Sequence, residues 1–489
     1  MRIFGIETEL GAGIWDPDAK RFSDESFTRR FMKFCGNDEA VGGMFLENGA
    51  RLYVDSGDHL EYATPECDSV RQVVVYEKAL DALMTRLVRE FNKNAPKVES
   101  HNGTEVLFLK NNSDGSGSAY GCHENYLISS ALWRELVSSA HTAAARIFLF
   151  FLAVRPILAG SGGLTSDLKF LFSPRAQFIT RDINSASTGS DRPLIHTKDE
   201  PLLAGIECKR LHLIIADSLM SEWSSYLRVA TTHLMLRALE RAVLTSHLHV
   251  TSIHDTLRRV INMSPVKLLH MVNGDIACER KYANGTVDAC DIHHALINFV
   301  DDMIGNAMDT QEEEMLWWWE VYVAKVQTRD EDFLASRLDW AIKKRIFEMH
   351  GHKNGIAPSH NIAHGTWQAF KSSPVAYKLR AIDLWYHRLA PEGIYYRLAA
   401  RGAVERFLTD EEVRMAQNTP PSTTRAHWRG MALQYVRDVL LPQRLNVKVK
   451  ADWQSITICL PGKDHVFRND SPRVPAWSDI KEFIDQYVR

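Results

Sequence analysis

The sequence predicts an α+β fold, because strand-forming and helix-forming segments fall in separate blocks. Strand signals occur near both ends of the first sixty residues, at residues 3–10 and 51–55. Long stretches with apolar residues at helical spacing follow at 70–92 and 132–154. Strands and helices do not alternate one by one, so the pattern argues against a doubly wound parallel sheet.

The rest of the chain continues this blockwise pattern. The further predicted elements, in chain order, are a strand at 106–110, loops at 111–118 and 184–192, a strand at 211–216, and helices at 219–244, 312–326, 331–350 and 377–389. The run Thr-Pro-Pro-Ser-Thr-Thr within residues 418–424 interrupts the pattern. It predicts a large domain at 1–417 and a small C-terminal domain of helix and strands at 418–489.

Composition limits the classes of function. A chain of 489 residues exceeds one ordinary core, and a net charge of −3 gives no reason to expect nucleic acid or an acidic membrane as partner. The longest apolar run, 147–154, is too short to span a bilayer, and no signal segment precedes the first strand. Seven cysteines, an odd number placed singly, favour reduced thiols in a cytoplasmic protein.

A zinc site is a weak alternative. Cys278, Cys290, His293 and His294 are near one another in sequence, but no Cys-x-x-Cys pair anchors them. The simpler interpretation is a β-hairpin region with turns at 273–274 and 284–285, leading into a helix.

The strand at 51–55 carries the most informative alternation in the chain. Arg51, Tyr53 and Asp55 point to one face, and the apolar residues between them point to the other. This places a phosphate-seeking cation beside a carboxylate that can act as a base. An exposed strand ending in a turn explains the segment equally well when it is taken alone.

The first predicted strand carries two carboxylates on one face, Glu7 and Glu9. Like charges side by side repel unless a cation lies between them, and Mg²⁺ is the usual one because it takes carboxylate oxygens together with phosphates. A solvated strand face is the alternative. Combined with the strand at 51–55, the pair predicts the floor of a metal–nucleotide site.

Short motifs occur along nearly the whole chain, and their order is more specific than any one of them. They are Gly5-Ile6-Glu7-Thr8-Glu9, residues 48–55, Glu61-Tyr62-Ala63-Thr64-Pro65-Glu66-Cys67, Lys110-Asn111-Asn112, Tyr120-Gly121-Cys122-His123-Glu124-Asn125-Tyr126-Leu127, Asp199-Glu200-Pro201, Arg210-Leu211-His212, Asp217 with Met220-Ser221-Glu222, Asp339-Trp340, and Thr423-Thr424-Arg425-Ala426-His427 with Arg429-Gly430. This ordered set resembles the family of Pup ligases and their sister depupylases, carboxylate–amine ligase-like enzymes related to glutamine synthetase. The resemblance implies a glutamine synthetase-like large domain, with a curved antiparallel sheet backed by helices, and a small C-terminal domain that contributes to the nucleotide site.

The resemblance also implies roles for individual residues, with ATP and Mg²⁺ as cofactors. By position in the motifs, the metal ligands are Glu7, Tyr53 and Glu61, together with Glu9 and His212; the ATP contacts are Arg51, Thr64 and Trp453; and the catalytic aspartate is Asp55. The implied reaction phosphorylates the C-terminal glutamate side chain of a small disordered Pup-like modifier protein. A lysine of a target protein then attacks, with Asp55 as general base.

Three details favour the ligase over the depupylase. The segment before the 51–55 strand, residues 35–47, is short, Tyr120-Gly121-Cys122-His123 contains the ligase's cysteine, and Glu61-Tyr62-Ala63-Thr64 follows the ligase wording, although Pro65 is closer to the depupylase. Departures at 198–202, 205–209, 173–176 and 386–388 leave the identity of the modifier open. A deamidase or isopeptidase of the same modifier, a small-molecule carboxylate–amine ligase and a nucleotide-sensing protein without turnover stay as alternatives.

Other conspicuous residues receive no chemical role. His123, Glu124 and Asn125 are adjacent and fit either a site wall or a hydrogen-bonded turn. Cys67 and Cys122 lack a base partner and are predicted to be buried thiols. The tryptophans at 317–319 are predicted to be packing residues.

Overall fold

The structure, a computed structural model, describes most of the chain in segments. These are residues 2–16, 21–23, 27–36, 43–55, 58–94, 105–113, 119–165, 168–186, 191–197, 207–246, 256, 260, 263–274, 280–282, 285–353, 374–440, 442, 448–460, 463–468 and 477–488.

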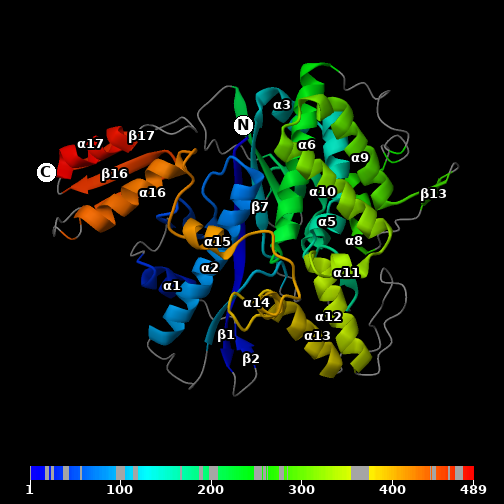
Figure 1. Ribbon diagram of the computed structural model, residues 1–489, viewed down its shortest axis with the longest axis horizontal. Helices are drawn as coiled ribbons and strands as arrows, with labels where there is room; N and C mark the ends of the chain where they lie inside the picture. Colours follow the sequence, from blue (N-terminus) through cyan, green and yellow to red (C-terminus); the bar gives the residue numbers. More distant parts are fainter. Residues whose placement is uncertain are drawn as a thin grey trace.

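A ten-stranded sheet forms the centre of the molecule, in the order β10-β11-β12-β7-β1-β5-β4-β3, with β2 and β6 also paired to β1 (Figure 1). The strands are β1 (Phe4–Asp16), β2 (Arg21–Ser23), β3 (Met44–Phe45), β4 (Arg51–Val54), β5 (Leu60–Ala63), β6 (Glu105–Leu109), β7 (Cys122–Ser129), β10 (Arg181–Asn184), β11 (Pro193–His196) and β12 (Cys208–Ala216). All described pairs in this sheet are antiparallel except β10 with β11. The predicted α+β class is confirmed.

Helices cover the apolar face of this sheet. The main ones are α2 (Val70–Asn94), α6 (Glu222–Leu244), α9 (Ala289–Ile304) and α10 (Thr310–Gln327), and the last three lie as a group beside β7 in Figure 1. Strand residues such as Ile6, Leu10, Leu52 and Tyr62 are buried on this side, as their alternation requires. The opposite side of the central strands is left to polar residues.

Buried ion pairs hold the helices under the sheet. Lys110 Nζ lies 3.0 Å from Asp81 Oδ2 and 3.2 Å from Glu77 Oε1, and Arg228 Nη2 donates to Glu77 Oε2 at 2.8 Å. These side chains are at most 4% exposed, so each charge depends on its partner. The pairs tie α2 and α6 together below the central strands.

The predicted helix at 132–154 is wrong as one element. The structure has α3 (Ser130–Ser138) and α4 (Ala143–Val154), which meet at 77°. The break occurs because Ser139 is extended and the side chain of Thr142 accepts a hydrogen bond from the Ala145 N–H, which caps a new helix.

None of the helices in the described segments combines the length and the hydropathy that a membrane span requires. The bent pair of α3 and α4 passes only when the two are taken together, and almost all of α4 is buried in the core.

The other predicted helices are present with shifted ends. The remaining helices, short helical turns and outlying strands are α1 (Thr28–Phe34), α5 (Pro156–Ala159), η1 (Arg175–Phe178), α8 (Pro265–Gly274), η3 (Gly305–Ala307), α11 (Glu331–Leu334), α12 (Asp339–Lys353), α13 (Pro374–Tyr386), α14 (Ile394–Ala400), α15 (Asp410–Ala416), β8 (Gly163–Leu164), β9 (Phe170–Leu171), β13 (Arg280–Tyr282) and β14 (Gly285–Val287). In place of the single helix predicted at 331–350, the structure has two helices, α11 and α12. Residues 273–274 end α8 and are not a hairpin turn, whereas β13 and β14 do form the second predicted hairpin.

The C-terminal part has its own small core. It contains α16 (Ala426–Tyr435), the π-helical turn η5 (Val436–Leu440), β15 (Lys448–Ala451), β16 (Ser455–Leu460), β17 (Lys463–Arg468) and α17 (Trp477–Val488). The three strands form a separate antiparallel sheet, and Ile456 and Ile458 of β16 share one buried core with Trp428, Ile480 and Ile484. The boundary at 417/418 itself stays a prediction.

Candidate active site

Strand register gathers the polar residues of the central strands on one face. Glu61 lies opposite Glu9 on one side and opposite Tyr53 on the other, while Ala63 lies opposite both Glu7 and Arg51. Residues directly opposite one another in an antiparallel pair share a face. The acids of β1, the cation and phenol of β4 and Glu61 of β5 are therefore neighbours, as the alternation predicts.

Three carboxylates form the first cluster on this face. Oxygen atoms of Glu9, Asp55 and Glu61 all lie within 4.8 Å of one another. Burial, followed by the charges of Glu7 and Glu9, raises the pKa of Glu61 well above its ordinary value. Burial, then the charges of Glu7 and Glu61, also raises the pKa of Tyr53. Such an excess of negative charge with oxygen donors fits a hard divalent cation.

Two imidazoles and a carboxylate form the second cluster. Glu7 Oε2 lies 3.3 Å from His123 Nδ1 and 3.9 Å from His212 Nε2. His212 is 9% exposed, and neither of its ring nitrogens has a hydrogen-bond partner within the described part of the chain. Burial lowers the pKa of His212 well below its usual value, so the ring is neutral and free to ligate. This donor set fits a divalent metal.

The surroundings of Glu7 stabilise its charged form. Burial would raise the pKa of Glu7, but its hydrogen bond with His123 and the positive charge of Arg210 hold that pKa well below the usual range. Asn125 Nδ2 donates to Glu7 Oε1 at 3.0 Å, and Arg210 Nη1 donates to Asn125 Oδ1 at 2.9 Å. Glu7 is therefore an ionised carboxylate in position to bind a cation.

The sequence reasoning missed His123, Asn125 and Arg210 as site residues. His123 lies opposite Glu7, and Asn125 lies opposite His212, so β7 fills the gap between β1 and β12. Glu124 points to the other face and forms a buried ion pair with Arg155 at 2.6 Å. If residues 122–129 are recognised as a strand, the alternation of side chains predicts that His123 and Asn125 share one face and that Glu124 lies on the other.

Asp55 lies immediately after β4, where the chain turns toward β5. Its backbone N–H donates to the His59 carbonyl at 2.9 Å. On β1, which pairs with β5, Glu9 Oε2 accepts a hydrogen bond from the Gly121 N–H at 2.7 Å and lies 3.9 Å from His59 Nδ1. Asp55 is only partly buried, so its carboxylate is at the edge of the acidic cluster that faces solvent.

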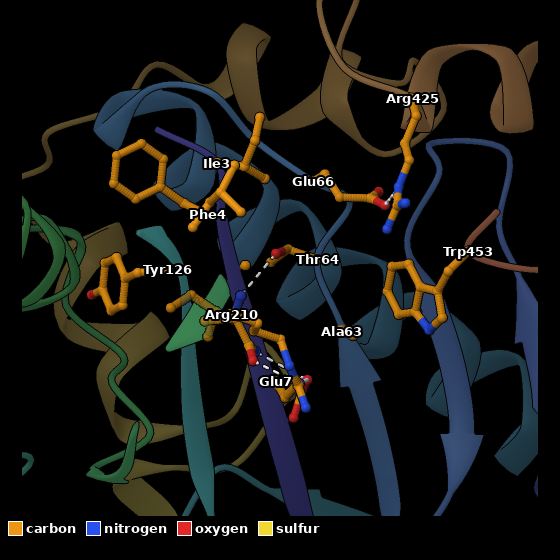
Figure 2. Close-up of a pocket in the computed structure, with 14 residues that line it drawn as sticks. Ile3, Phe4, Glu7, Ala63, Thr64, Glu66, Tyr126, Arg210, Arg425 and Trp453 are labelled. Carbon is orange, nitrogen blue, oxygen red and sulfur yellow. Dashed lines mark hydrogen bonds and ion pairs between the residues drawn. The ribbon is translucent and has the colours of Figure 1, made fainter. Parts of the chain in front are cut away.

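A pocket of about 570 Å³, including space open to solvent, lies next to these clusters (Figure 2). Its lining includes Glu7, Thr64, Trp453 and the apolar residues Ile3 and Phe4. Thr64 is fixed because its Oγ1 accepts the Ile6 N–H at 3.0 Å. The structure thus brings the predicted ATP contacts Thr64 and Trp453 to one pocket.

Arg51 does not line that pocket but lies in the adjacent row. Its guanidinium carbon is 4.8 Å from the ring centroid of Tyr53 and 5.7 Å from that of Phe45. Phe45 in turn meets Trp453 edge to face at 5.0 Å between centroids. Arg51 and Trp453 are therefore linked through one aromatic side chain.

The discarded alternatives gain no support. Cys278 lies outside the described residues, and both ring nitrogens of buried His293 are already engaged, with Trp319 Nε1 and the Val154 carbonyl. Cys67 and Cys122 are fully buried, and burial raises the pKa of Cys122 to about 11. The predicted buried thiols are confirmed.

Of the predicted packing tryptophans, Trp319 is buried but Trp317 is 53% exposed. The departures at 198–202 and at 205–206 also lie outside the described segments.

These features define a class of protein. The protein is an enzyme with an α+β fold. Its candidate active site is a face of an antiparallel sheet that carries carboxylates and imidazoles. An apolar pocket lies beside this face, and an aromatic side chain from the C-terminal part contributes to its lining. Comparison with known proteins then gives the family.

The family described as Pup-ligase protein matches residues 2–457, and the chain belongs to this family. A Pup–protein ligase of Renibacterium salmoninarum is 33% identical over 97% of this chain and 96% of its own length. A Pup–protein ligase of Arthrobacter sp. is 32% identical over 98% of this chain and 99% of its own. The predicted family, and the ligase branch of it, are confirmed.

Solved structures agree. A structure of Pup in complex with its ligase PafA matches with a TM-score of 0.79 and 26% identity, covering 99% of this chain and 92% of that one. A structure of PafA in complex with ADP matches with a TM-score of 0.74 and 25% identity, covering 94% and 93%. The similarity therefore spans the sheet, the helical layer and the C-terminal part.

Proposed function

We propose that this protein is an ATP- and Mg²⁺-dependent ligase that joins the C-terminal glutamate of a Pup-like modifier to a lysine of a target protein. The observation that carries the proposal is the meeting of Glu9, Asp55 and Glu61 within 4.8 Å, next to Glu7 and the pocket. Like charges so close repel one another unless a cation lies between them, and a cation beside an open pocket is an arrangement that suits phosphoryl transfer.

The metal would be held by residues of both clusters. Glu7, Glu9, Glu61 and His212 supply charged or neutral ligand atoms, and the Tyr53 phenol supplies an oxygen beside Glu61. Mg²⁺ bound by these residues would neutralise charge on the triphosphate and would help to orient it. Arg51, one row away on β4, would add a positive charge for the transferring phosphoryl group.

The reaction then follows in two steps, phosphorylation of the carboxylate and attack by the amine. An oxygen of the modifier's glutamate attacks the γ-phosphorus of ATP, which releases ADP and leaves an acyl phosphate. The lysine ammonium group first loses a proton to Asp55. The resulting amine attacks the acyl carbon, the bond between this carbon and the phosphate oxygen breaks, and phosphate leaves. Asp55 fits the base role because it is partly exposed and lies directly after β4 at the acidic cluster, where an amine can arrive from solvent.

The test is an incubation of the full chain with ATP, Mg²⁺, a Pup-type peptide ending in glutamate and a lysine-bearing acceptor protein. The proposal predicts one ADP per isopeptide bond, with no conjugate when the peptide ends in glutamine or when Mg²⁺ is chelated. Glutamate or another small carboxylate in place of the peptide serves as the control for a small-molecule ligase. If ADP forms only with the small donor, the modifier assignment fails.

The same assay separates ligase from hydrolase. Rapid release of ammonia from the glutamine-ending peptide, or cleavage of a purified conjugate without net ATP use, would show the deamidase or isopeptidase activity instead. A cytoplasmic location stays part of the prediction.

A further inference from the structure

Arg425 stands out among the residues that line the pocket. It is the residue just before α16, is 2% exposed, and reaches the pocket from the C-terminal part of the chain (Figure 2). The pocket walls are mainly apolar, formed by side chains such as Ile3, Tyr126, Leu127 and Trp453. A buried guanidinium at an apolar pocket requires a partner.

Glu66 fixes the position of this guanidinium. Arg425 Nε donates to Glu66 Oε1 at 2.6 Å, and the Thr424 hydroxyl donates to the Glu66 carbonyl at 2.6 Å. Arg429 donates to the other Glu66 oxygen at 2.6 Å. Glu66 therefore holds both arginines, and Arg425 is rigid before any ligand binds.

The two arginines differ in what their terminal nitrogens do. Both Nη atoms of Arg429 donate to protein groups, the Gly49 and Trp453 carbonyls. In the segments that the structure describes, Nη1 of Arg425 has no hydrogen-bond partner although it is buried. Native proteins rarely leave a buried charged donor without an acceptor, so this nitrogen is available to a ligand.

The position of Arg425 in the pocket indicates which part of a nucleotide this residue would contact. Glu66 follows Ala63, the residue opposite Glu7, by three positions, which is about 10 Å along an extended chain. The phosphates belong with the metal ligands at the Glu7 end. The Glu66 end, with an indole and aliphatic walls, suits a flat heterocycle.

We infer that Arg425 is a base-recognising residue of the nucleotide site, which donates a hydrogen bond from its terminal nitrogen to a ring nitrogen of a purine. The inference rests on the proposed use of ATP and adds a contact that selects the base. It distinguishes Arg425 from Arg429, whose terminal nitrogens are used to hold the protein together.

Binding of ATP, measured by calorimetry with the full chain and Mg²⁺, tests this inference. Arg425→Lys keeps a cation for Glu66 but removes the terminal donor, and we expect it to weaken ATP binding about tenfold or more. The matched control is Arg437→Gln: Arg437 also joins the C-terminal part to the large domain, through Glu47, but it is 51% exposed and does not line the pocket. It should bind ATP as the wild type does.

The 1-deaza, 3-deaza and 7-deaza analogues of ATP make the test independent of folding. One of them should bind the wild type about tenfold more weakly than ATP, yet bind Arg425→Lys no more weakly than ATP does. The inference is overturned if the wild type binds all three as it binds ATP, or if the same analogue penalty persists in the variant. A wild type that binds no ATP would overturn the proposed function itself.

Discussion

Glu9 and Glu61 lie directly opposite each other on β1 and β5, with their carboxylates in one cluster with Asp55. The register of two antiparallel strands imposes this proximity, so the chain cannot avoid the repulsion by rotating a loop. Repulsion that is built into a sheet is a feature of sites that are completed by a cation.

Asp55→Asn should leave ATP binding unchanged and abolish ligation. The amide keeps the size of the carboxylate but takes no proton from the lysine ammonium, so the loss of rate should be about a hundredfold or more. Calorimetry measures ATP binding, and a gel assay measures conjugate. A variant with full ligation would exclude Asp55 as the base.

Glu61→Gln should separate stability from activity. The pKa of Glu61 is raised by burial and by Glu7 and Glu9, so the charged form is unfavourable without a cation. In EDTA the variant should melt at the same or a higher temperature than the wild type, whereas ligation with Mg²⁺ should fall by about a hundredfold. A lower melting temperature in EDTA would show that Glu61 is stabilised by protein contacts alone.

Glu66 should control stability on the acid side. Burial would raise its pKa, but Arg429 and Arg425 outweigh burial and lower the pKa from 4.5 to about 2. A carboxyl group with a depressed pKa in the folded state stabilises the protein above pH 4.5, and this stabilisation is lost as the pH falls from 4.5 to 2.

The full contribution of this shift is about 3 kcal/mol by linkage. Chemical denaturation at pH 3 and pH 6 measures the part that is lost between these two pH values, about 2 kcal/mol. Glu66→Gln should lower stability at pH 6 and reduce the difference between the two pH values. An unchanged difference in the variant would mean that other groups cause the acid sensitivity.

Gly49→Ala should loosen the junction between the turn before β4 and α16. Gly49 has φ +82°, and a Cβ there would lie 2.8 Å from the Ala426 Cβ. Gly402→Ala is the matched control, because Gly402 has φ +69° with nothing within 4 Å. Both substitutions incur the left-handed strain of about 1–2 kcal/mol, but only Gly49→Ala adds the clash.

Thermal unfolding and KM for ATP should therefore distinguish the two alanine variants. Gly402→Ala is expected to lower only the melting temperature. Gly49→Ala should lower it further and raise KM for ATP, because Arg429 donates to the Gly49 carbonyl and carries Trp453 with it. Equal effects of both substitutions would show that the junction does not position Trp453.

Sequence alone was sufficient for the parts of the site that depend on alternation within one strand. Glu7 with Glu9, and Arg51 with Tyr53 and Asp55, are each on one face by the two-residue period of a strand, and the structure places both sets together. The family motifs supplied Glu61 and His212, whose positions alone do not indicate proximity to Glu7.

The missed residues depend on information that a single strand does not contain. His123 and Asn125 become site residues only because β7 lies between β1 and β12, and strand order in a sheet is set by long-range pairing. The bend between α3 and α4 was missed for a local reason: the apolar periodicity continues through Thr142, whose capping hydrogen bond outweighs it.

The most direct test of the account follows the oxygen atoms of the modifier. The side-chain carboxylate of the C-terminal glutamate is labelled with ¹⁸O, and the labelled peptide is converted with ATP, Mg²⁺ and an acceptor lysine. The account predicts one ¹⁸O atom in the phosphate released for each isopeptide bond, because the attacking oxygen leaves with the phosphoryl group. Conjugate formed together with unlabelled phosphate would contradict carboxylate phosphorylation as the reaction of this site.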